Sequence, residues 1–210
     1  MNIEETKKIT LSLLETFNKA GSICLNLRKA GLKKENKSDN TPVSNADIEV
    51  NKILTEKISE ITPNIVIISE ETSVNKNDKN LKNFWLIDPI DGTRDYIDNK
   101  DEFTINAALI LNNKPAIGII NAPAKNRVFY SYAASNSYEL IGKQKIELIN
   151  KKKDYKGIKA VSYSNELKPE ISEIHKKFKV KSCQKMKSSL KFCVIAAGEF
   201  DLYAAEPRAF

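Results

Sequence analysis

Two short apolar runs, each followed at once by carboxylates, constrain this sequence most. Residues 65–68 (Ile-Val-Ile-Ile) lead into Ser69-Glu70-Glu71, and residues 84–87 (Phe-Trp-Leu-Ile) lead into Asp88-Pro89-Ile90-Asp91-Gly92-Thr93. Short continuous runs of this kind are typical of strands buried on both faces of a sheet. The sequence therefore predicts two core strands that deliver acidic side chains at their carboxyl ends.

Two amphipathic helices are predicted ahead of these strands. Apolar residues recur at helical spacing from Ile3 to Leu32, and again from a cap at Asn45 or Asp47 to a helix end at Pro63. The polar stretch 33–40 separates the two patterns. Their apolar stripes are expected to cover one side of a sheet.

The middle of the chain has an antiparallel pattern. Residues 103–140 contain three or four strand-like runs, which turn-forming residues at 112–115 and 123–126 divide. Neighbouring strands joined by such short turns are expected to pair in one sheet.

A second α/β unit is predicted after the lysine-rich connection 151–159. A strand near 158–161 and a helix over 166–178 begin it, and a further strand and helix continue it to about Ala197. A chain of 210 residues with 41% hydrophobic side chains can bury one domain and a smaller lobe.

We therefore predict an α/β fold, more closely an α+β layered sandwich in which a mixed and largely antiparallel sheet lies between helix layers. The predicted organisation is an N-terminal α+β lobe at residues 1–150 and a partial C-terminal α/β lobe at residues 151–210.

The net charge of +7 arises in the second half of the chain. Residues 1–100 carry 15 Lys and Arg against 16 Asp and Glu, whereas residues 101–210 carry 19 against 11. A basic half can attract phosphate-bearing ligands over long range, but the abundance of Lys, Asn and Ile throughout favours a compositional bias. Because the aromatic residues do not interleave with the basic ones, no nucleic-acid partner is expected.

Neither a secretory nor a membrane-spanning signal is recognisable. The acidic start Met1-Asn2-Ile3-Glu4-Glu5 lacks a basic and then apolar leader, and no apolar run approaches membrane-spanning length. A cytoplasmic location is expected. Cys24, Cys183 and Cys193 show no C-x-x-C spacing and are expected to be buried free thiols.

Several catalytic mechanisms lack the residues that they need. The only histidine, His175, lies in a charged helical pattern at 173–177 and is expected to face solvent, which leaves no base for a Ser-His-Asp or Cys-His site. Histidine-based zinc catalysis is excluded for the same reason. The sequence contains no G-x-x-x-x-G-K-[ST] loop, so a P-loop nucleotidase or kinase is not supported.

The turn after residues 84–87 can hold two carboxylates close together. Pro89 fixes one backbone dihedral angle and Gly92 permits a positive one, so Asp88 and Asp91 can approach each other. Two carboxylates about 4 Å apart repel by roughly 4 kcal/mol at an effective dielectric of 20, so they must share a proton or hold a cation. A plain surface turn is the alternative, but two strands that both end in carboxylates argue against it.

A hard divalent cation is the natural partner for such oxygen ligands. Mg²⁺ keeps several waters and takes few protein carboxylates, and Glu70 supplies a third beside Asp88 and Asp91. Thr93 adds a hydroxyl group, and the amides after Gly92 can receive a phosphate at a helix start. We therefore predict metal-assisted hydrolysis in which water attacks phosphorus.

Further blocks accompany the aspartate motif, and together they span most of the chain. These blocks are Asp39-Asn40-Thr41-Pro42-Val43, Ala46-Asp47, Ser69-Glu70-Glu71, Trp85-Leu86-Ile87-Asp88-Pro89-Ile90-Asp91-Gly92-Thr93-Arg94-Asp95-Tyr96-Ile97, Glu102-Phe103-Thr104-Ile105-Asn106 and Ser188-Ser189-Leu190-Lys191-Phe192-Cys193. The sequence thereby resembles the inositol monophosphatase superfamily. The flanking blocks favour its CysQ-type 3'(2'),5'-bisphosphate nucleotidase branch over inositol or fructose phosphatases.

The resemblance implies a sugar-phosphatase-like fold and a place in sulfur metabolism. The implied reaction is the Mg²⁺-dependent removal of the 3'-phosphate from adenosine 3',5'-bisphosphate, with 3'-phosphoadenylyl sulfate as a further substrate. We expect two or three Mg²⁺ ions, sensitivity to lithium and a small nucleotide bisphosphate as the partner. A homodimer is compatible with the resemblance.

The resemblance also implies a set of metal ligands by position. Glu70, Asp88 and the Ile90 carbonyl would hold one metal ion, and Asp88 and Asp91 a second. Glu70 would also count among the catalytic residues, and both Glu70 and Asp91 would contact the substrate.

Five further positions receive roles from the resemblance. Asp47 would assist a water or a third metal ion, and Thr93 would orient the nucleophilic water. The amides of Gly92 and Thr93 would hold phosphate. Ser188 and Ser189 would contact the nucleotide at the start of a helix, or would only cap that helix.

The sequence departs from the family pattern at two places. Lys187 stands where the family has a glycine before the serine pair, and Phe210 ends the chain where the family continues into a Trp-Asp motif with the last ligand of the second metal. An incomplete C-terminal lobe and weakened or lost catalysis are therefore expected. The alternatives are an inositol monophosphatase-like phosphatase, a non-catalytic metal or nucleotide binder, and a remnant without function.

Overall fold

The structure of the chain, a computed structural model, describes residues 1–36, 41–72, 80–149 and 157–206. Its helices are α1 (Ile3–Ala30), α2 (Asn45–Ile61), α3 (Thr93–Ile97), α4 (Pro169–Lys177) and α5 (Leu190–Ala196), with a short 3-10 helix η1 (Pro123–Lys125). Its strands are β1 (Lys34–Asn36), β2 (Pro42–Ser44), β3 (Val66–Ser69), β4 (Phe84–Asp91), β5 (Thr104–Leu111), β6 (Lys114–Ala122), β7 (Arg127–Tyr132), β8 (Ser137–Ile141), β9 (Gln144–Leu148), β10 (Ile158–Ser162), β11 (Val180–Lys185) and β12 (Leu202–Tyr203). The motif residues Asp39-Asn40, most of the lysine-rich connection (151–156) and the last residues 207–210 lie outside the described ranges.

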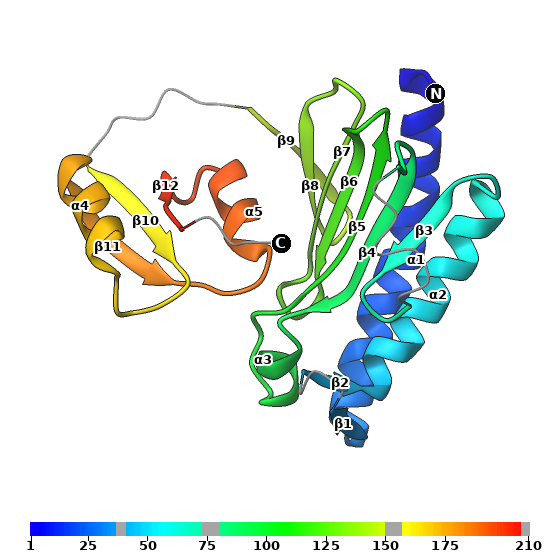
Figure 1. The fold of residues 1–210 in the computed structure, drawn as a ribbon, viewed down its shortest axis with the longest axis horizontal. Coiled ribbons are helices and arrows are strands. Elements are labelled where there is room, and N and C mark those ends of the chain that lie inside the picture. Colours follow the sequence, from blue (N-terminus) through cyan, green and yellow to red (C-terminus); the bar gives the residue numbers. More distant parts are fainter. Residues whose placement is uncertain (37–40, 73–79, 150–156, 207–210) are drawn as a thin grey trace.

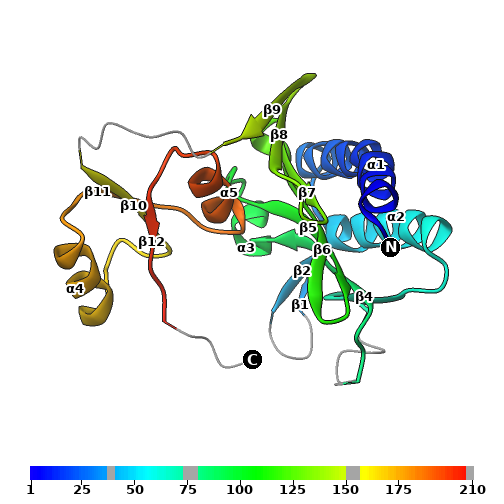
Figure 2. The same ribbon diagram turned by 90° about the horizontal axis from the view of Figure 1, so that it is seen from above.

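The described residues form three sheets: a two-stranded antiparallel one of β1 and β2, and a large and a small sheet that alternate with three helix layers. The large sheet has seven strands in the order β3-β4-β5-β6-β7-β8-β9, of which β3 and β4 run parallel while all other neighbours are antiparallel. The small sheet is parallel, with the order β11-β10-β12. Figure 1 and Figure 2 show α1 and α2 on one face of the large sheet, α5 between the sheets and α4 outermost. The predicted layered α/β sandwich with a mixed sheet is confirmed.

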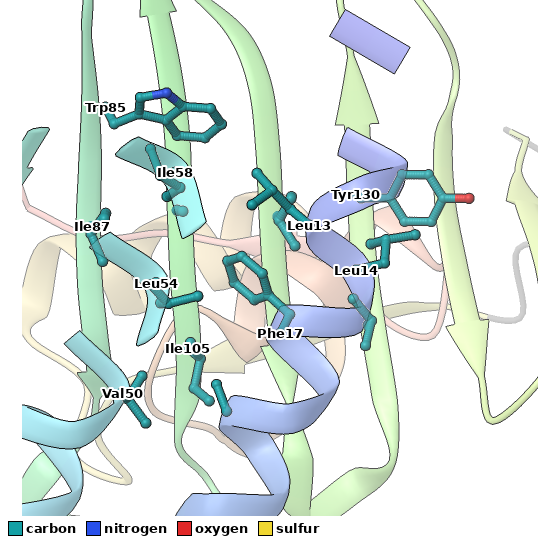
Figure 3. Packing of buried hydrophobic residues seen from close by; sticks show 14 of the residues in the cluster. Leu13, Leu14, Phe17, Val50, Leu54, Ile58, Trp85, Ile87, Ile105 and Tyr130 are labelled. Atoms are coloured by element: carbon teal, nitrogen blue, oxygen red, sulfur yellow. The ribbon is translucent and has the colours of Figure 1, made fainter. Parts of the chain in front are cut away.

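The main core lies between the two long helices and the large sheet. Figure 3 shows Phe17 of α1 and Leu54 of α2 pointing onto the strands that carry Trp85 and Ile105. All four side chains are fully buried. Each large apolar side chain removed from water in this way contributes about 1.5–3 kcal/mol. None of the helices in the described ranges is long and apolar enough to cross a membrane.

Long-range hydrogen bonds tie α1 and α2 to the sheet at fixed points. Trp85 Nε1 donates to Thr62 Oγ1 at 3.0 Å, directly after α2. Asn121 Nδ2 of β6 donates to the Phe17 carbonyl oxygen at 2.7 Å, inside α1. Close approach is possible there because Gly21 has no Cβ; an added one would lie 2.8 Å from Asn121 Nδ2. These bonds satisfy buried polar groups that would otherwise destabilise the fold.

Some local predictions are wrong. Among the described residues β3 pairs with β4 alone and is an edge strand, and Val66–Ile68 are half-buried rather than buried on both faces. Helix α4 begins at Pro169 and not at Glu166, since proline suits the first turn of a helix. His175 is buried and does not face solvent, and Cys183 is exposed. The other two cysteines are buried free thiols, as predicted.

The segment 157–206, called the second lobe below, meets the preceding part of the chain, the first lobe, through a second, smaller apolar cluster. Phe129 of β7 packs there with Leu190 of α5. Arg127 of β7 forms ion pairs with Glu139 of β8 and with Glu199, which follows α5. The arginine thus ties the end of α5 to the large sheet.

An apolar cavity of about 440 Å³ remains between the large sheet and α5. Its lining includes Leu86 and Phe192, which are 49% and 52% exposed, and also Asp88, Asn106 and Ser189. This face of the sheet is therefore covered less completely than the face beneath α1 and α2.

We expect Phe17→Ala to destabilise the protein by about 3–5 kcal/mol, because a fully buried aromatic side chain leaves a cavity that its neighbours fill only in part. Leu11→Ala is the matched control in the same helix, since Leu11 is 44% exposed, and should cost less than about 1 kcal/mol. Urea unfolding followed by circular dichroism measures both. Equal losses for the two variants would contradict the described packing of α1.

Candidate functional site

A β-bulge sets the direction of Asp88 and Asp91. The register of β4 and β5 matches Asp88 with Asn106 and Asp91 with Thr104, so β4 has one extra residue between the two pairs. In a regular strand, side chains three residues apart point to opposite faces, whereas the extra residue of a bulge allows them to share one. Pro89 suits the bulge because it has no N–H for the ladder. Pairing with β5 resumes after the bulge, so β4 continues to Asp91, whereas the apolar run alone predicted a strand that ends at Ile87.

Strand β3 brings Glu70 beside the bulge. Ser69 is in register with Ile87, and the Glu70 N–H donates to the Ile87 carbonyl oxygen at 3.1 Å. The carboxyl group of Glu70 lies close enough to that of Asp88 to raise the pKa of Asp88. The Ser69 hydroxyl donates to Asn51 Oδ1 of α2 at 2.6 Å, which fixes the end of β3 against that helix.

Asp88 is the electrostatic centre of the site. Its Oδ1 is buried and has no hydrogen-bond partner among the described residues. Burial first, and then the neighbouring charges of Asp91, Glu70 and Asp47, raise the pKa of Asp88 to about 8. An ionised Asp88 therefore requires a cation close by, or a proton shared with a neighbour.

Asp47 stands at the amino end of α2. Ser44 caps this helix, rather than Asn45 or Asp47 as predicted. Asp47 Oδ2 accepts hydrogen bonds from the Ser44 amide at 2.8 Å and from the Ser44 hydroxyl at 2.6 Å, which completes a capping box. Burial raises the pKa of the Asp47 carboxyl in spite of the Ser44 hydrogen bonds, and the charge of Glu71 adds to the rise.

Gly92 and Thr93 turn the chain from β4 into α3. Gly92 has a φ of +95°, and a Cβ added there would lie 3.0 Å from the Glu102 carbonyl oxygen. Thr93 Oγ1 donates to the Ile90 carbonyl oxygen at 2.9 Å and lies 3.3 Å from Asp47 Oδ1. Because a hydroxyl has one proton, Thr93 can donate its hydrogen bond either to the Ile90 carbonyl oxygen or to Asp47.

Ser189 reaches the site from the second lobe. Its Oγ donates to Asp91 Oδ2 at 2.7 Å and accepts from Asn106 Nδ2 at 3.2 Å. Ser189 occupies the N-cap position of α5, but its side chain makes no capping hydrogen bond. Ser188 Oγ instead accepts from the Leu190 amide at 3.3 Å.

The structure thus gathers Glu70, Asp88, Asp91 and Asp47 in one electrostatic cluster, with Ser189 in contact with it. Sequence reasoning assigned no role to Ser44 and Asn106. The capping-box spacing of Ser44 and Asp47 was a signal for the first. No local signal marks Asn106, because its partner Ser189 lies 83 residues away.

The chemistry of these donors fits Mg²⁺. Within the described ranges, no group of three or more His, Cys, Asp or Glu side chains is arranged to hold a metal ion by itself. Mg²⁺ does not require such a cage, because it keeps several waters and takes one or two carboxylates. Asp88 Oδ1, which has no hydrogen-bond partner among the described residues, and the neighbouring carboxylates of Asp91 and Glu70 are oxygen donors of the kind that Mg²⁺ takes.

The sequence matches the inositol monophosphatase family over residues 5–209. The 3'(2'),5'-bisphosphate nucleotidase CysQ of Buchnera aphidicola is 39% identical over 173 residues, which are 80% of this chain and 63% of that relative. The chain therefore spans somewhat less than two thirds of the length of that relative.

Solved structures share the fold. CysQ from Bacteroides thetaiotaomicron has a TM-score of 0.70 at 24% identity, over 95% of this chain and 80% of that chain. An IMPase/NADP phosphatase complexed with Mg²⁺ and phosphate has a TM-score of 0.74 at 15% identity, over 94% of this chain and 73% of that chain. At these identities the likeness establishes the layered fold alone.

We expect the metal-free protein to lose stability as the pH rises from about 4 to 8. The pKa of Asp88 is raised from 3.8 to about 8 on folding, so the folded state binds this proton more tightly than the unfolded state does. This stabilisation is complete below the lower pKa and is lost as the pH passes the higher one. Asp88→Asn removes the titration and should raise the melting temperature in EDTA at pH 8 by on the order of 5 °C.

Calorimetry at pH 4 and pH 8 measures this difference, which should vanish at pH 4. Asp98→Asn is the control, because the Asp98 side chain is 61% exposed and should show no such pH-dependent gain. A melting temperature of Asp88→Asn equal to that of the wild type at pH 8 would contradict the described burial.

Proposed function

The chain belongs to the inositol monophosphatase family, and from this premise we propose that it is a Mg²⁺-dependent phosphomonoesterase that removes the 3'-phosphate from adenosine 3',5'-bisphosphate. The proposal is carried by the buried Oδ1 of Asp88, which has no hydrogen-bond partner in the described part of the chain and lies among other carboxylates beside a glycine turn. The 39% identity to a 3'(2'),5'-bisphosphate nucleotidase supports the substrate class. A cytoplasmic location, a homodimer and 3'-phosphoadenylyl sulfate as a second substrate stay predictions.

In this proposal the cluster around Asp88 holds two or three Mg²⁺ ions. The ligands would be Glu70, Asp88, the Ile90 carbonyl and Asp91. Bound Mg²⁺ supplies positive charge that neutralises the phosphate oxygens and acidifies water. Without a cation, the same carboxylates repel an anionic phosphate, so substrate binding depends on metal loading.

Asp47 and Thr93 would handle the proton of the attacking water. Thr93 Oγ1, held between Ile90 and Asp47, would orient the water, and Asp47 would accept its proton. The raised pKa of Asp47 makes its ionised form a stronger base. The water oxygen forms a bond to phosphorus while the bond to the 3'-oxygen breaks, and that oxygen takes up a proton.

The turn at Gly92 would bind the phosphate. α3 begins directly after Gly92, so the first amides of this turn have no carbonyl partner within the helix and are available to an anion. Ser189 would support this arrangement through its hydrogen bond to Asp91. Substrate contacts of Glu70, Ser188 and Ser189 are part of the same proposal.

Phosphate release from adenosine 3',5'-bisphosphate tests the proposal. We expect slow turnover by the purified chain with Mg²⁺, none in EDTA, and a still slower reaction with inositol 1-phosphate. Asp88→Asn should lower kcat/KM by roughly 100-fold, which corresponds to about 2.7 kcal/mol of transition-state stabilisation. Asp98→Asn, at an exposed position of the same region, should retain wild-type rates.

Two results would overturn the proposal in different ways. Equal rates of phosphate release with and without EDTA would show that the reaction does not need a metal ion. No phosphate release from any substrate, together with Mg²⁺ binding in a calorimetric titration, would leave a metal-binding protein without phosphatase activity.

A further inference from the structure

Three consecutive residues of the second lobe, Lys187, Ser188 and Ser189, make contact with the aspartate turn one after another. Ser189 Oγ donates to Asp91 Oδ2 at 2.7 Å. Ser188 Cβ lies 3.6 Å from the position that a Cβ on Gly92 would occupy. At the other end, Lys187 Nζ lies 2.9 Å from Asp95 Oδ2. The tripeptide therefore runs along the segment from the candidate metal ligands to α3.

Asp95 is an unusual anchor because it is a buried acid. Its side chain is only 5% exposed, and it forms ion pairs with Lys187 and with Lys100. Burial favours the neutral acid, but the hydrogen bonds and charges of the two lysines outweigh it and hold the pKa of Asp95 below its ordinary value. A buried carboxylate of this kind is costly to leave without a partner.

The two lysines differ in what they connect. Lys100 lies five residues after Asp95, and its side chain is 56% exposed. Lys187 lies 92 residues away, in the other lobe, and its side chain is 24% exposed. The Lys187 amide also donates to Glu102 Oε2 at 3.2 Å. Only Lys187 can therefore connect Asp95 to the segment that carries Ser189.

Ser188 shows that this segment needs to be held. Its φ is +52°, in the left-handed region that glycine adopts freely and other residues adopt at a cost. Its side chain is buried, and contacts on both sides keep the conformation: Lys187 on Asp95 and Ser189 on Asp91.

We propose that Lys187 is a positioning residue, whose ion pair with the buried Asp95 holds Ser189 against Asp91 and so fixes the orientation of a metal-binding carboxylate. The proposal rests on the proposed function for its effect on the metal, but the contact between the lobes exists without it. In the proposed role, Lys187 does not contact the substrate or the metal. It acts through Ser189.

Hydrogen exchange of the metal-free protein tests the contact itself. Lys187→Met should increase the exchange rates of amides in both segments, 91–95 and 188–192, by about tenfold, because the lobes separate more often there. Lys100→Met is the matched control, since it removes the other lysine from the same carboxylate, and should leave segment 188–192 within about twofold of the wild type. Equal effects of the two variants on segment 188–192 would overturn the proposal, because both lysines would then only neutralise Asp95.

Calorimetric titration with Mg²⁺ tests the consequence for the site. Lys187→Met should weaken Mg²⁺ binding by about five- to tenfold, whereas Lys187→Arg, which keeps the charge, and Lys100→Met should stay within about twofold of the wild type. Unchanged Mg²⁺ affinity in Lys187→Met would overturn the positioning role. If the wild type bound no Mg²⁺, the proposed metal site would fail, and hydrogen exchange alone would still decide whether Lys187 connects the two segments.

Discussion

Repulsion between carboxylates around Asp88 is the constraint on which the rest of the structure depends. The bulge in β4 turns Asp88 and Asp91 to one side, β3 adds Glu70, and α2 adds Asp47. Two such charges about 4 Å apart repel by roughly 4 kcal/mol at an effective dielectric of 20, so the groups would move apart on a flexible frame. Burial of large side chains of α1 and α2 against the same strands opposes such a movement. Core packing thus keeps together carboxylates whose mutual repulsion would separate them, as the proposed metal site requires.

Much of this arrangement could be predicted from sequence because its determinants are local. The apolar run at the start of β4 predicts the strand, Pro89 lacks the N–H that a regular ladder needs, and Gly92 permits the positive φ of the turn. The long helices follow from apolar periodicity, and the layered fold follows from the order of elements. Predictions were wrong where burial depends on distant segments. Periodicity alone could not indicate that β3 lies at a sheet edge or that α4 turns His175 inward.

The second lobe's share of the site is the part that local sequence could not reveal. Ser189 and Asp91 are 98 residues apart, and Lys187 and Asp95 are 92 residues apart. The family resemblance pointed to the serine pair as candidate substrate contacts, but only the fold shows that Ser189 donates to a candidate metal ligand and that Ser188 turns to the Leu190 amide. A local sequence pattern cannot indicate such a pairing, because the pairing depends on how the small sheet and α5 lie against the large sheet.

The two lobes contribute groups of different kinds to the site: carboxylates from the first lobe and hydrogen-bond donors from the second. All four carboxylates of the cluster around Asp88 come from the first lobe, and the described contacts from the second lobe to Asp91 and Asp95 are made by a hydroxyl and an ammonium group. Hydrogen-bond donors from the second lobe therefore offset part of the repulsion without adding to it. Ser189 uses only Oδ2 of Asp91, and a carboxylate can accept at both oxygens. Because the described contact of Ser189 is to Oδ2, the hydroxyl can orient Asp91 without using Oδ1, and the contact between the lobes is compatible with the proposed metal site.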